Sequence, residues 1–577
     1  MVGILMRSLE ASTVREIPSR LLDFYLARAR RILPALLVMC TAVIIVSWFY
    51  LSPTKYKSLA VQVVSAIGFY SNSLFLGQSG YFDTEAKQKI LLHTWSLSVE
   101  WQFYIALPLF MIAVWLLKKG RSWQGIALCS FGLISLGYCL HLTGSNPHKA
   151  FYSTFSRSWE MLVGGGVYLL SANKEVKVKW LGNVGFLVII VSAIFFDSNT
   201  AWPGLGAIIP VSASAIILYG NSNYFWISNK VVQYLGDRSY SIYLWHWPIV
   251  VAIGFSDIQT SIASIVGGIC LSLLLAELSY RFVERKAKSS FLNYERKAAF
   301  VVSLAILFSV VALGLIVRHA QGYPSRLPAM AVDLAKYRFS YKEYRLGQCF
   351  LSEVESYKVF NDCISPGSVD SPKILLWGDS HAAHLYPGLS KNLPENERLA
   401  QFTASGCPPF VGIKIDDREN CKNINGFVED WIVNNHPDEV ILSARWSRYD
   451  WKLLGKTLDF LHDNGVRKVT VFGPVPIWNG ALVDIIVENL LPRSSEIPDR
   501  QKSYLISDNG VDDGVRKISE DHGVRFLSAR QILCNDQGCM THLSTKDGPV
   551  PMAWDEAHLS SQASDYLVVH SRIFQSE

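Results

Sequence analysis

Long apolar runs occupy the first part of the chain and stop near residue 320. Ten of them approach the roughly 17–25 residues that a membrane-spanning helix needs. They cover residues 32–52, 58–76, 97–117, 124–142, 151–172, 180–196, 204–219, 239–254, 261–283 and 298–318. Beyond them, charged residues, Asn, Trp and Pro are interspersed as in a soluble domain. The pattern predicts a polytopic helical membrane domain over 1–318, a linker over 319–345 and a soluble domain over 346–577.

The basic connections between these runs predict the topology, because Lys/Arg-rich loops face the cytoplasm. They read RARR (28–31), KKGR (118–121), NKEVKVK (173–179) and RFVERKAK (281–288). Ten full spans would place KKGR outside. The run 58–76 is the most polar, so we expect it to be interfacial or re-entrant. About nine spans then place every basic loop inside and residue 319 onward outside the cytoplasm.

The soluble part alternates buried-strand patterns with helical ones. Strand-like runs occur at 373–379 (KILLWGD), 438–444 (DEVILSA), 467–474 (RKVTVFGP) and 524–529 (VRFLSA). Continuous apolar strands separated by amphipathic helices are typical of a parallel sheet covered on both faces. The expected fold is therefore a three-layer α/β domain.

Charge and composition narrow the class of partner. The net charge is +6 and only 18% of residues are charged, with half of the chain apolar. No basic stripe interleaved with aromatic residues is present, so nucleic acid is not an expected partner. The basic residues fit the loops of a protein whose first partner is the lipid bilayer.

The ten cysteines divide between the two parts. Four lie in apolar runs, where a thiol behaves as a small hydrophobic group. An even number in the soluble part suggests disulfides in an oxidising compartment. Sequence proximity favours Cys349–Cys363, Cys407–Cys421 and Cys534–Cys539. The alternative is a set of six buried thiols.

Ionisable residues near the ends of apolar runs are candidates for function, because charges are costly inside a bilayer. They are His93, Glu100, Arg157, Glu160 and His246. The structural alternative pairs Arg157 with one of the two carboxylates and uses His246 to cap a helix broken before Pro248. Five such residues together favour a polar cavity.

The soluble domain carries a hydrolase-type constellation. Gly378-Asp379-Ser380-His381 follows a predicted strand directly, where catalytic groups of parallel α/β folds lie. A serine hydroxyl needs a base, for which His558 is the candidate, and Asp555 is placed to orient the imidazole. The alternative for Ser380 is a helix N-cap.

Two further histidines lie close to Ser380 in the sequence. We interpret His381 and His384 as residues around the site or on the surface rather than as the base. No ligand spacing typical of a metal site is evident, so no metal is expected.

The strings RRILPALL, HTWSLSVEWQFY, RSWEMLVGG, DRSYSIYLWHWP and RFVERKA resemble the acyltransferase family 3 membrane domain, in the family's order. The resemblance implies a multi-pass protein of the bacterial inner membrane with its C-terminal domain in the periplasm. It also implies acetyl-CoA as the acyl donor and a surface polysaccharide, commonly lipopolysaccharide O-antigen, as the acceptor. His93, Glu100, Arg157, Glu160 and His246 would then form the acyl relay or the acetyl-CoA site.

The block GDSH with D-x-x-H near the C-terminus resembles the SGNH hydrolase superfamily. The resemblance implies an oxyanion hole built from the N–H groups of Ser380 and Gly406, the latter in ASGCPP. The family's third-block Asn is not matched, because the corresponding strand reads LSARW (442–446). Arg445 or Trp446 is a candidate for contacting the sugar instead, and ordinary packing is an equal alternative for Trp446.

The chain departs from the acyltransferase pattern at its beginning. The family starts with a helix carrying an Asp-Gly-Leu-Arg motif and a following His, and then a second helix. This chain starts near the end of that second helix, so we expect an incomplete membrane domain with an exposed edge.

The leading hypothesis is a membrane-bound O-acyltransferase that modifies a surface glycan. Acetyl groups would pass through the membrane domain to Ser380 and then to a sugar hydroxyl. The alternatives are a membrane-tethered carbohydrate esterase and a glycan transport component.

Overall fold

The computed structural model divides the chain into two compact units, with the main division between Gln321 and Gly322. It describes all residues except 1, 11–13, 79–87, 119, 172–178, 198–199, 221–223, 225, 256–260, 290–295, 338, 367, 369–371, 416–417, 419, 491–495 and 576–577.

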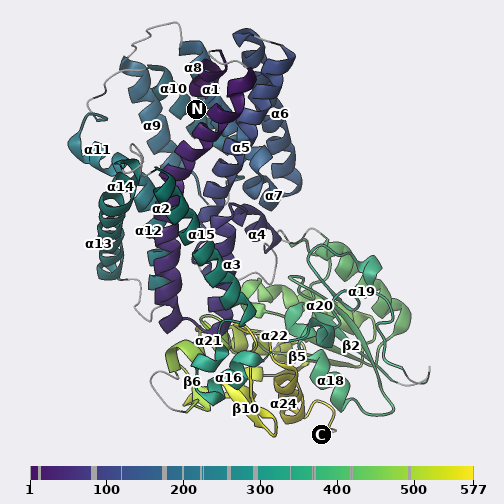
Figure 1. Cartoon of the computed structure of the whole chain (residues 1–577). Helices are drawn as coiled ribbons and strands as arrows, with labels where there is room; N and C mark the ends of the chain where they lie inside the picture. The colour runs from purple at the N-terminus through teal and green to yellow at the C-terminus, as the bar shows by residue number, and fades with distance from the viewer. Residues whose placement is uncertain are drawn as a thin grey trace. The chain divides into compact units, whose positions relative to one another are not determined.

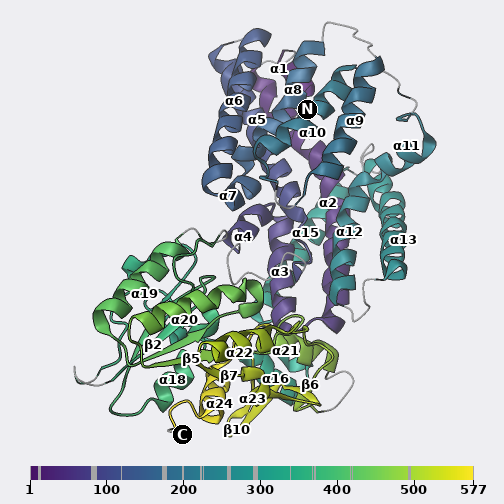
Figure 2. The same ribbon diagram turned by 180° about the vertical axis from the view of Figure 1, so that it is seen from behind.

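The first unit is helical (Figures 1 and 2). Its helices are α1 (Val2–Glu10), α2 (Ile17–Tyr50), α3 (Pro53–Ile67), α4 (Ser71–Gly77), α5 (Thr94–Leu117), α6 (Arg121–Ser145), α7 (Pro147–Tyr152), α8 (Thr154–Ser171), α9 (Lys179–Phe195), α10 (Gly204–Gly220), α11 (Lys230–Asp237), α12 (Ser239–Phe255), α13 (Ile262–Ser279), α14 (Arg285–Ser289) and α15 (Arg296–His319). Neighbouring pairs such as α6 with α8, α9 with α10 and α12 with α13 pack together.

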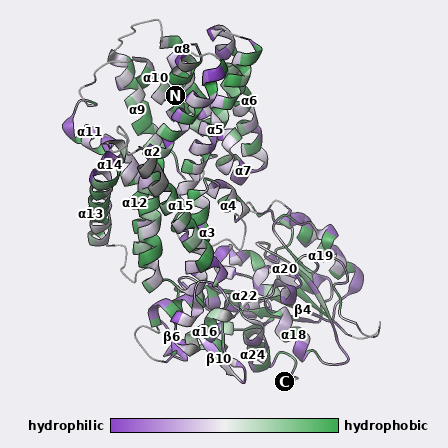
Figure 3. Cartoon of the chain, in the orientation of Figure 1, coloured by the Kyte–Doolittle hydropathy of each residue, from purple (hydrophilic) through white to green (hydrophobic). Residues whose placement is uncertain are grey.

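Many of these helices are apolar along their length, as Figure 3 shows. Among the described residues, four helices are long and apolar enough to cross a membrane: Val14–Tyr50, Thr94–Leu117, Arg121–Ser145 and Ile262–Ala287. Three shorter apolar helices are Trp180–Phe195, Gly204–Gly220 and Leu304–His319. These helices agree with a membrane domain, and the count of about nine spans stays a prediction.

The polar run 58–76 forms two helices rather than one. α3 ends at Ile67 and α4 begins at Ser71, with Phe69 between them in the left-handed region at φ 52°. Its polar side chains face the bundle: Gln62 accepts a hydrogen bond from the backbone N–H of Leu91 at 2.9 Å, and Ser71 pairs with Ser98 at 2.7 Å. Internal partners allow polar groups in such a segment.

The second unit is built on a six-stranded sheet in the order β1-β3-β2-β4-β5-β7, with every neighbouring pair parallel. The strands are β1 (Phe350–Leu351), β2 (Lys373–Gly378), β3 (Arg398–Ala404), β4 (Glu439–Ser443), β5 (Lys468–Phe472) and β7 (Arg525–Leu527). Two small antiparallel sheets join β6 (Arg500–Gln501), β9 (Gly538–Met540) and β8 (Cys534–Asn535), and β10 (His542–Thr545) with β11 (Gly548–Pro551).

Helices cover both faces of the parallel sheet. Since alternate strand residues point to opposite sides, each face of the sheet has its own apolar core. Ile374 and Leu376 of β2 lie in one core, with the helices α16 (Ala329–Lys336), α18 (Tyr386–Asn392), α21 (Leu482–Ile485), α23 (Ala529–Leu533) and α24 (Ser561–Ser571). Leu375 and Trp377 lie in the other, with α19 (Cys421–Asn435), α20 (Leu454–Asp463) and α22 (Val511–Asp521). The predicted three-layer α/β arrangement with a parallel sheet is what the structure contains.

The segment 319–345 is not a free linker, so that expectation is wrong. Within it, Leu334 of α16 is fully buried in the sheet's core. Tyr344, in a short 3-10 turn (Tyr341–Tyr344), is also fully buried. Pro324 and Pro328 are typical of a linker, but the apolar and aromatic residues that follow them belong to the second unit.

Candidate active site

The turn after β2 carries the candidate nucleophile. Gly378 ends the strand at φ 151°, and a Cβ at this position would lie 1.9 Å from the carbonyl oxygen of Ser443 on β4. Only glycine therefore lets the two strand ends come this close. Asp379 caps the short helix α17 (Ser380–Ala383), accepting a hydrogen bond from the backbone N–H of His381 at 2.7 Å. The N-cap is thus Asp379, and the alternative that Ser380 serves as the cap is wrong.

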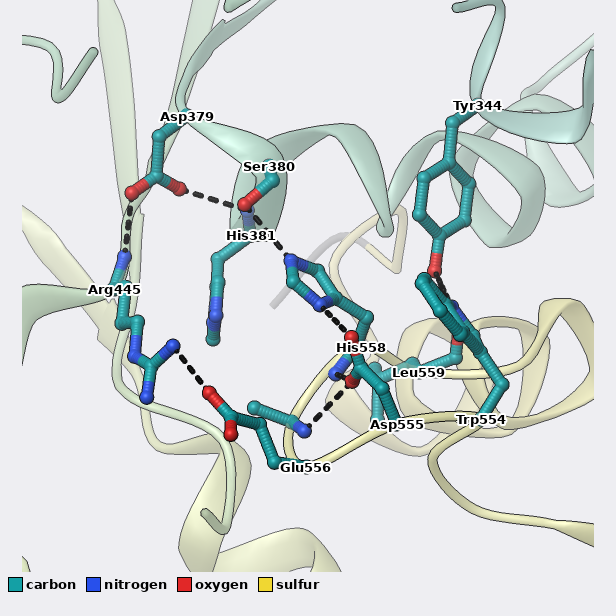
Figure 4. A network of polar contacts seen from close by, with 11 residues as sticks. Tyr344, Asp379, Ser380, His381, Arg445, Trp554, Asp555, Glu556, His558 and Leu559 are labelled. Atoms are coloured by element: carbon teal, nitrogen blue, oxygen red, sulfur yellow. Dashed lines mark hydrogen bonds and ion pairs between the residues drawn. The ribbon is translucent and has the colours of Figure 1, made fainter. Parts of the chain in front are cut away.

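Ser380, His558 and Asp555 form a continuous hydrogen-bonded triad (Figure 4). The hydroxyl of Ser380 lies 2.8 Å from Nε2 of His558, and Nδ1 of His558 lies 2.7 Å from Oδ2 of Asp555. The second oxygen of Asp555 accepts from the backbone N–H groups of Ala557 and His558, at 2.9 and 2.7 Å. Nε2 is therefore left to accept the serine proton.

Electrostatics keep Asp555 ionised. Burial alone raises the pKa of this carboxyl, but the charge of His558 and the hydrogen bonds from His558 and Ala557 outweigh burial and lower the pKa below its ordinary value. A carboxylate at this position stabilises an imidazolium that forms when His558 takes a proton.

Asp379 ties the nucleophile turn to the loop after β4. Besides His381, its carboxylate accepts from the backbone N–H of Arg445 and from the hydroxyl of Tyr449, both at 3.0 Å. Burial nevertheless raises the pKa of Asp379. The guanidinium of Arg445 pairs with Glu556 at 2.7 Å, next to Asp555 in sequence. This ion pair places a cation and an anion beside the triad (Figure 4).

Gly406 lies at the same end of the sheet as Ser380. Thr403 of β3 is paired with Gly378 of β2, so the turns that follow the two strands are neighbours. Gly406 adopts φ 67°, a left-handed conformation that suits glycine. Its role as an oxyanion donor remains a prediction that this placement permits.

Three disulfides join the cysteines of this unit in the pairing that proximity favours: Cys349–Cys363, Cys407–Cys421 and Cys534–Cys539. The second of them begins at the residue after Gly406. The alternative of free thiols is wrong for these positions.

His381 and His384 are both buried, at 2% and 0% exposure, so neither is a surface residue. Their rings lie 5.0 and 6.2 Å from the ring of His558. Burial lowers the pKa of each well below its ordinary value, and the nearby charge of His558 adds to this effect. Both therefore stay neutral beside the triad.

Trp446 is fully buried in the core and donates to the carbonyl of Phe472 at 2.7 Å. Of its two interpretations, ordinary packing is therefore confirmed and the sugar contact is wrong. Arg445, in contrast, stays partly exposed at the site.

In the first unit, His93 and His246 lie together. Their ring centroids are 5.7 Å apart, and the ring of Tyr243 lies 5.1 Å from that of His93. The Tyr243 hydroxyl bonds to the His93 carbonyl and to Ser96. α12 runs through Pro248 to Phe255, so His246 does not cap a helix broken there.

Glu100, Arg157 and Glu160 line a cavity of about 410 Å³ between α5 and α8. Arg157 pairs with Glu160 at 2.7 Å, and Glu100 accepts from Tyr104. Ser96 lines the same cavity and connects it, through Tyr243, to the two histidines. The five residues predicted from sequence therefore form two neighbouring groups.

The sequence did not single out Asp379, Glu556 or Tyr449 as parts of the site. Asp379 lies inside the block GDSH, and Glu556 lies inside the block D-x-x-H, so their positions next to the triad are a usable signal. Tyr449 follows the LSARW string at a distance that no pattern marks.

Two family models match this chain. Residues 5–281 match the acyltransferase domain, and residues 348–570 match the SGNH domain that occurs fused to such domains.

Among curated relatives, the chain is 28% identical over 302 residues to "Putative peptidoglycan O-acetyltransferase YrhL" of Bacillus subtilis, covering 48% of this chain and 47% of that protein. It is 26% identical over 297 residues to peptidoglycan O-acetyltransferase OatA of Listeria monocytogenes, covering 48% of each. The chain thus spans about half the length of these relatives.

A solved structure, the periplasmic domain of a lipopolysaccharide acetyltransferase of Salmonella ser. Paratyphi A, is 27% identical. The match covers 41% of this chain and 94% of the chain of that structure, with a TM-score of 0.35.

Proposed function

The chain is an acyltransferase domain fused to an SGNH domain, and on that premise we propose that it is a membrane-bound O-acetyltransferase of surface polysaccharide. The acetyl group would be carried through a covalent ester on Ser380. The observation that carries this proposal is the unbroken chain of hydrogen bonds from Ser380 through His558 to Asp555.

In the first half-reaction, the Ser380 hydroxyl attacks the acyl carbon of the incoming donor. His558 accepts the hydroxyl proton at Nε2, and Asp555 stabilises the imidazolium. The oxyanion that develops needs N–H donors, for which Ser380 and Gly406 are the candidates. The proton on His558 then goes to the leaving group, and Ser380 is left as an ester.

In the second half-reaction, a sugar hydroxyl replaces the donor. His558 takes its proton, the sugar oxygen attacks the ester carbon, and the bond to the serine oxygen breaks. Ser380 recovers its proton from His558. Transfer prevails over hydrolysis only if the sugar is held better than water, and the Arg445–Glu556 pair offers a donor and an acceptor for sugar hydroxyls beside the triad.

The membrane unit would supply the acyl group. We assign acetyl-CoA as the donor, taken from the cytoplasmic side, and the two groups around His93 and Glu100 as its handling site. The cavity lined by Glu100, Arg157 and Glu160 contains a cation that suits an anionic or carbonyl-bearing ligand. In this proposal the second unit lies in the periplasm and the first in the inner membrane.

The acceptor class is a polysaccharide of the cell surface. Relatives named as peptidoglycan O-acetyltransferases support a glycan acceptor. Lipopolysaccharide O-antigen and peptidoglycan share the chemistry that matters here, namely free sugar hydroxyls outside the cytoplasm, and the test must examine both.

Replacing Ser380 with Ala tests this proposal. We expect base-labile acetate on the surface glycan to fall by at least about a thousandfold in S380A cells, because the nucleophile of a triad is indispensable. The measurement is mass spectrometry of purified O-antigen and peptidoglycan from cells that depend on this gene.

Ser519→Ala is the matched control, because Ser519 is an equally buried serine whose hydroxyl donates within its own helix, α22. Normal acetylation in S380A cells would contradict the proposal. An increase in acetate on loss of Ser380 would instead identify an esterase.

A further inference from the structure

A stack of aromatic rings lies behind the catalytic histidine. Trp554 lies face to face with His558, with ring centroids 5.6 Å apart and planes 22° from parallel. Phe339 also stacks on Trp554, with ring centroids 4.9 Å apart and planes 5° from parallel. The indole is therefore in ring contact with both His558 and Phe339, which makes Trp554 a support for His558 rather than an open platform for a sugar ring.

The rings that hold Trp554 come from the segment that precedes the sheet. Tyr341 meets the indole edge-on at 5.5 Å. The indole N–H of Trp554 donates to the hydroxyl of Tyr344 at 3.1 Å, and that hydroxyl donates to the carbonyl of Leu559 at 2.5 Å. Tyr344 thus fixes the residues on both sides of His558 (Figure 4).

The same segment contacts the nucleophile side of the site. Tyr344 and Phe339 pack with Ala383, which belongs to α17, the helix that begins at Ser380. The carbonyl of Tyr344 also accepts from Gln401 of β3 at 3.0 Å. One short stretch of chain therefore touches the helix of the nucleophile and the loop of the base.

The phenol of Tyr341 stays neutral beside the indole. Burial raises its pKa to about 12, and the charge of Asp555 adds to the effect. The ring that meets Trp554 edge-on is therefore uncharged.

We propose that Phe339, Tyr341 and Tyr344 are positioning residues that hold the imidazole of His558 against Ser380 through Trp554. The inference rests on the proposed role of the triad. In this proposal, the segment that follows α15 in the chain is part of the active site, because its aromatic residues set the position of the His558 imidazole.

The test measures how fast Ser380 reacts in the full-length chain in membranes. A fluorophosphonate probe forms a bond between its phosphorus and the serine oxygen and releases fluoride, while His558 takes the serine proton. Because the probe bypasses the acyl donor and the glycan, it reports the triad alone. The rate of labelling reports geometry, and the final labelled fraction reports how much protein is folded.

We expect Phe339→Leu to slow labelling about tenfold with an unchanged final fraction, since small misplacements of catalytic groups are costly. Phe339→Tyr keeps the stacked ring and should stay within about twofold of the natural chain. Phe360→Leu is the control, because Phe360 packs on Phe402 and Phe427 elsewhere in the unit, and it should label at the natural rate.

Tyr344→Phe provides a second variant that removes one oxygen and keeps the ring. It should also slow labelling, because the carbonyl of Leu559 and the indole N–H lose their shared partner. Natural labelling rates in both Phe339→Leu and Tyr344→Phe would overturn the inference alone. Failure of Ser380 to label in the unaltered chain would overturn the proposed function, and the inference with it.

Discussion

Asp555 shows how a single residue sets the chemistry of the site. Its carboxylate accepts from the ring of His558 and from two backbone N–H groups, and these interactions lower its pKa despite burial. Asp555 therefore stays charged at neutral and mildly acidic pH. A loss of activity on mild acidification would not come from protonation of this carboxylate.

Asp555→Asn should lower the labelling rate of Ser380 by about 10⁴-fold, because an amide does not hold the imidazole in the required tautomer. A pKa that is lower in the folded state contributes stability above the unfolded value of about 3.9, and this contribution is lost as pH falls through the folded pKa. The stability advantage of the natural chain over Asp555→Asn should therefore shrink below about pH 4.

Thermal unfolding of the detergent-solubilised full chain at several pH values measures this advantage. An advantage that grows as pH falls would contradict the assignment of Asp555 as the charged partner.

The triad residues could be predicted from sequence, because GDSH and D-x-x-H are short local motifs whose Ser, Asp and His are the residue types of a serine-hydrolase triad. The partners of Asp379 could not, since Arg445 and Tyr449 reach it only after β2 and β4 pair. The same holds for His381 and His384, whose burial depends on the packing of α17.

Among the elements, the site is formed by the loops after β2, β3 and β4 together with the segment between β11 and α24. The disulfide Cys407–Cys421 anchors the loop after β3 to the start of α19, with a sequence separation of 14. The disulfide Cys534–Cys539 closes a separation of only 5 in the hairpin of β8 and β9. Removing each disulfide in turn therefore distinguishes an effect on the loop at the active site from an effect on the stability of the whole unit.

Replacing both Cys407 and Cys421 with Ala should cost about 3 kcal/mol of unfolding free energy, and the same change at Cys534 and Cys539 about 2 kcal/mol, from the lengths of the closed loops. We expect only the first pair to slow labelling of Ser380 as well, because Gly406 is the neighbour of Cys407. Labelling rates measured below the unfolding temperature, with melting curves beside them, give both quantities. Equal labelling rates for the two double variants would show that the loop is held by other contacts.

Strands could be predicted where the apolar run is continuous, as in β2, β4 and β5. β3 escaped prediction because Gln401 and Thr403 interrupt its apolar pattern. Both are fully buried and hydrogen-bonded, Gln401 to the Tyr344 carbonyl and Thr403 to the Cys349 carbonyl at 3.2 Å. Those partners lie more than fifty residues away in the chain, so no local pattern reveals them.

For the segment 319–345, in contrast, a local pattern that indicates packing is present in the sequence. Its prolines and mixed charges indicated a spacer, yet YRFSYKEY at 337–344 contains four aromatic residues in eight. Flexible linkers are poor in aromatic residues, so this string was a usable signal for a packed segment. What it packs against depends on the position of Trp554 in the fold.

At the scale of the whole molecule, one chain combines two units of different chemical character. An apolar helical unit contains a polar cavity with Glu100, Arg157 and Glu160, and an α/β unit contains a serine triad. In the proposed function, the first unit handles the acyl donor and the second unit forms the serine ester, so both units are needed. Division of labour of this kind predicts that Ser380 is acylated only when the first unit functions.

The most direct measurement supplies isotope-labelled acetyl-CoA to the cytoplasmic face of membranes containing the full chain, and then locates the label by peptide mass spectrometry. We expect labelled acetyl on the Ser380 peptide. When a surface-glycan acceptor is added, the label should leave this peptide and appear on sugar. Ser519→Ala should behave like the natural chain. Label that reaches the glycan in Ser380→Ala membranes would contradict the proposed function, because the acetyl group would then pass without the serine ester.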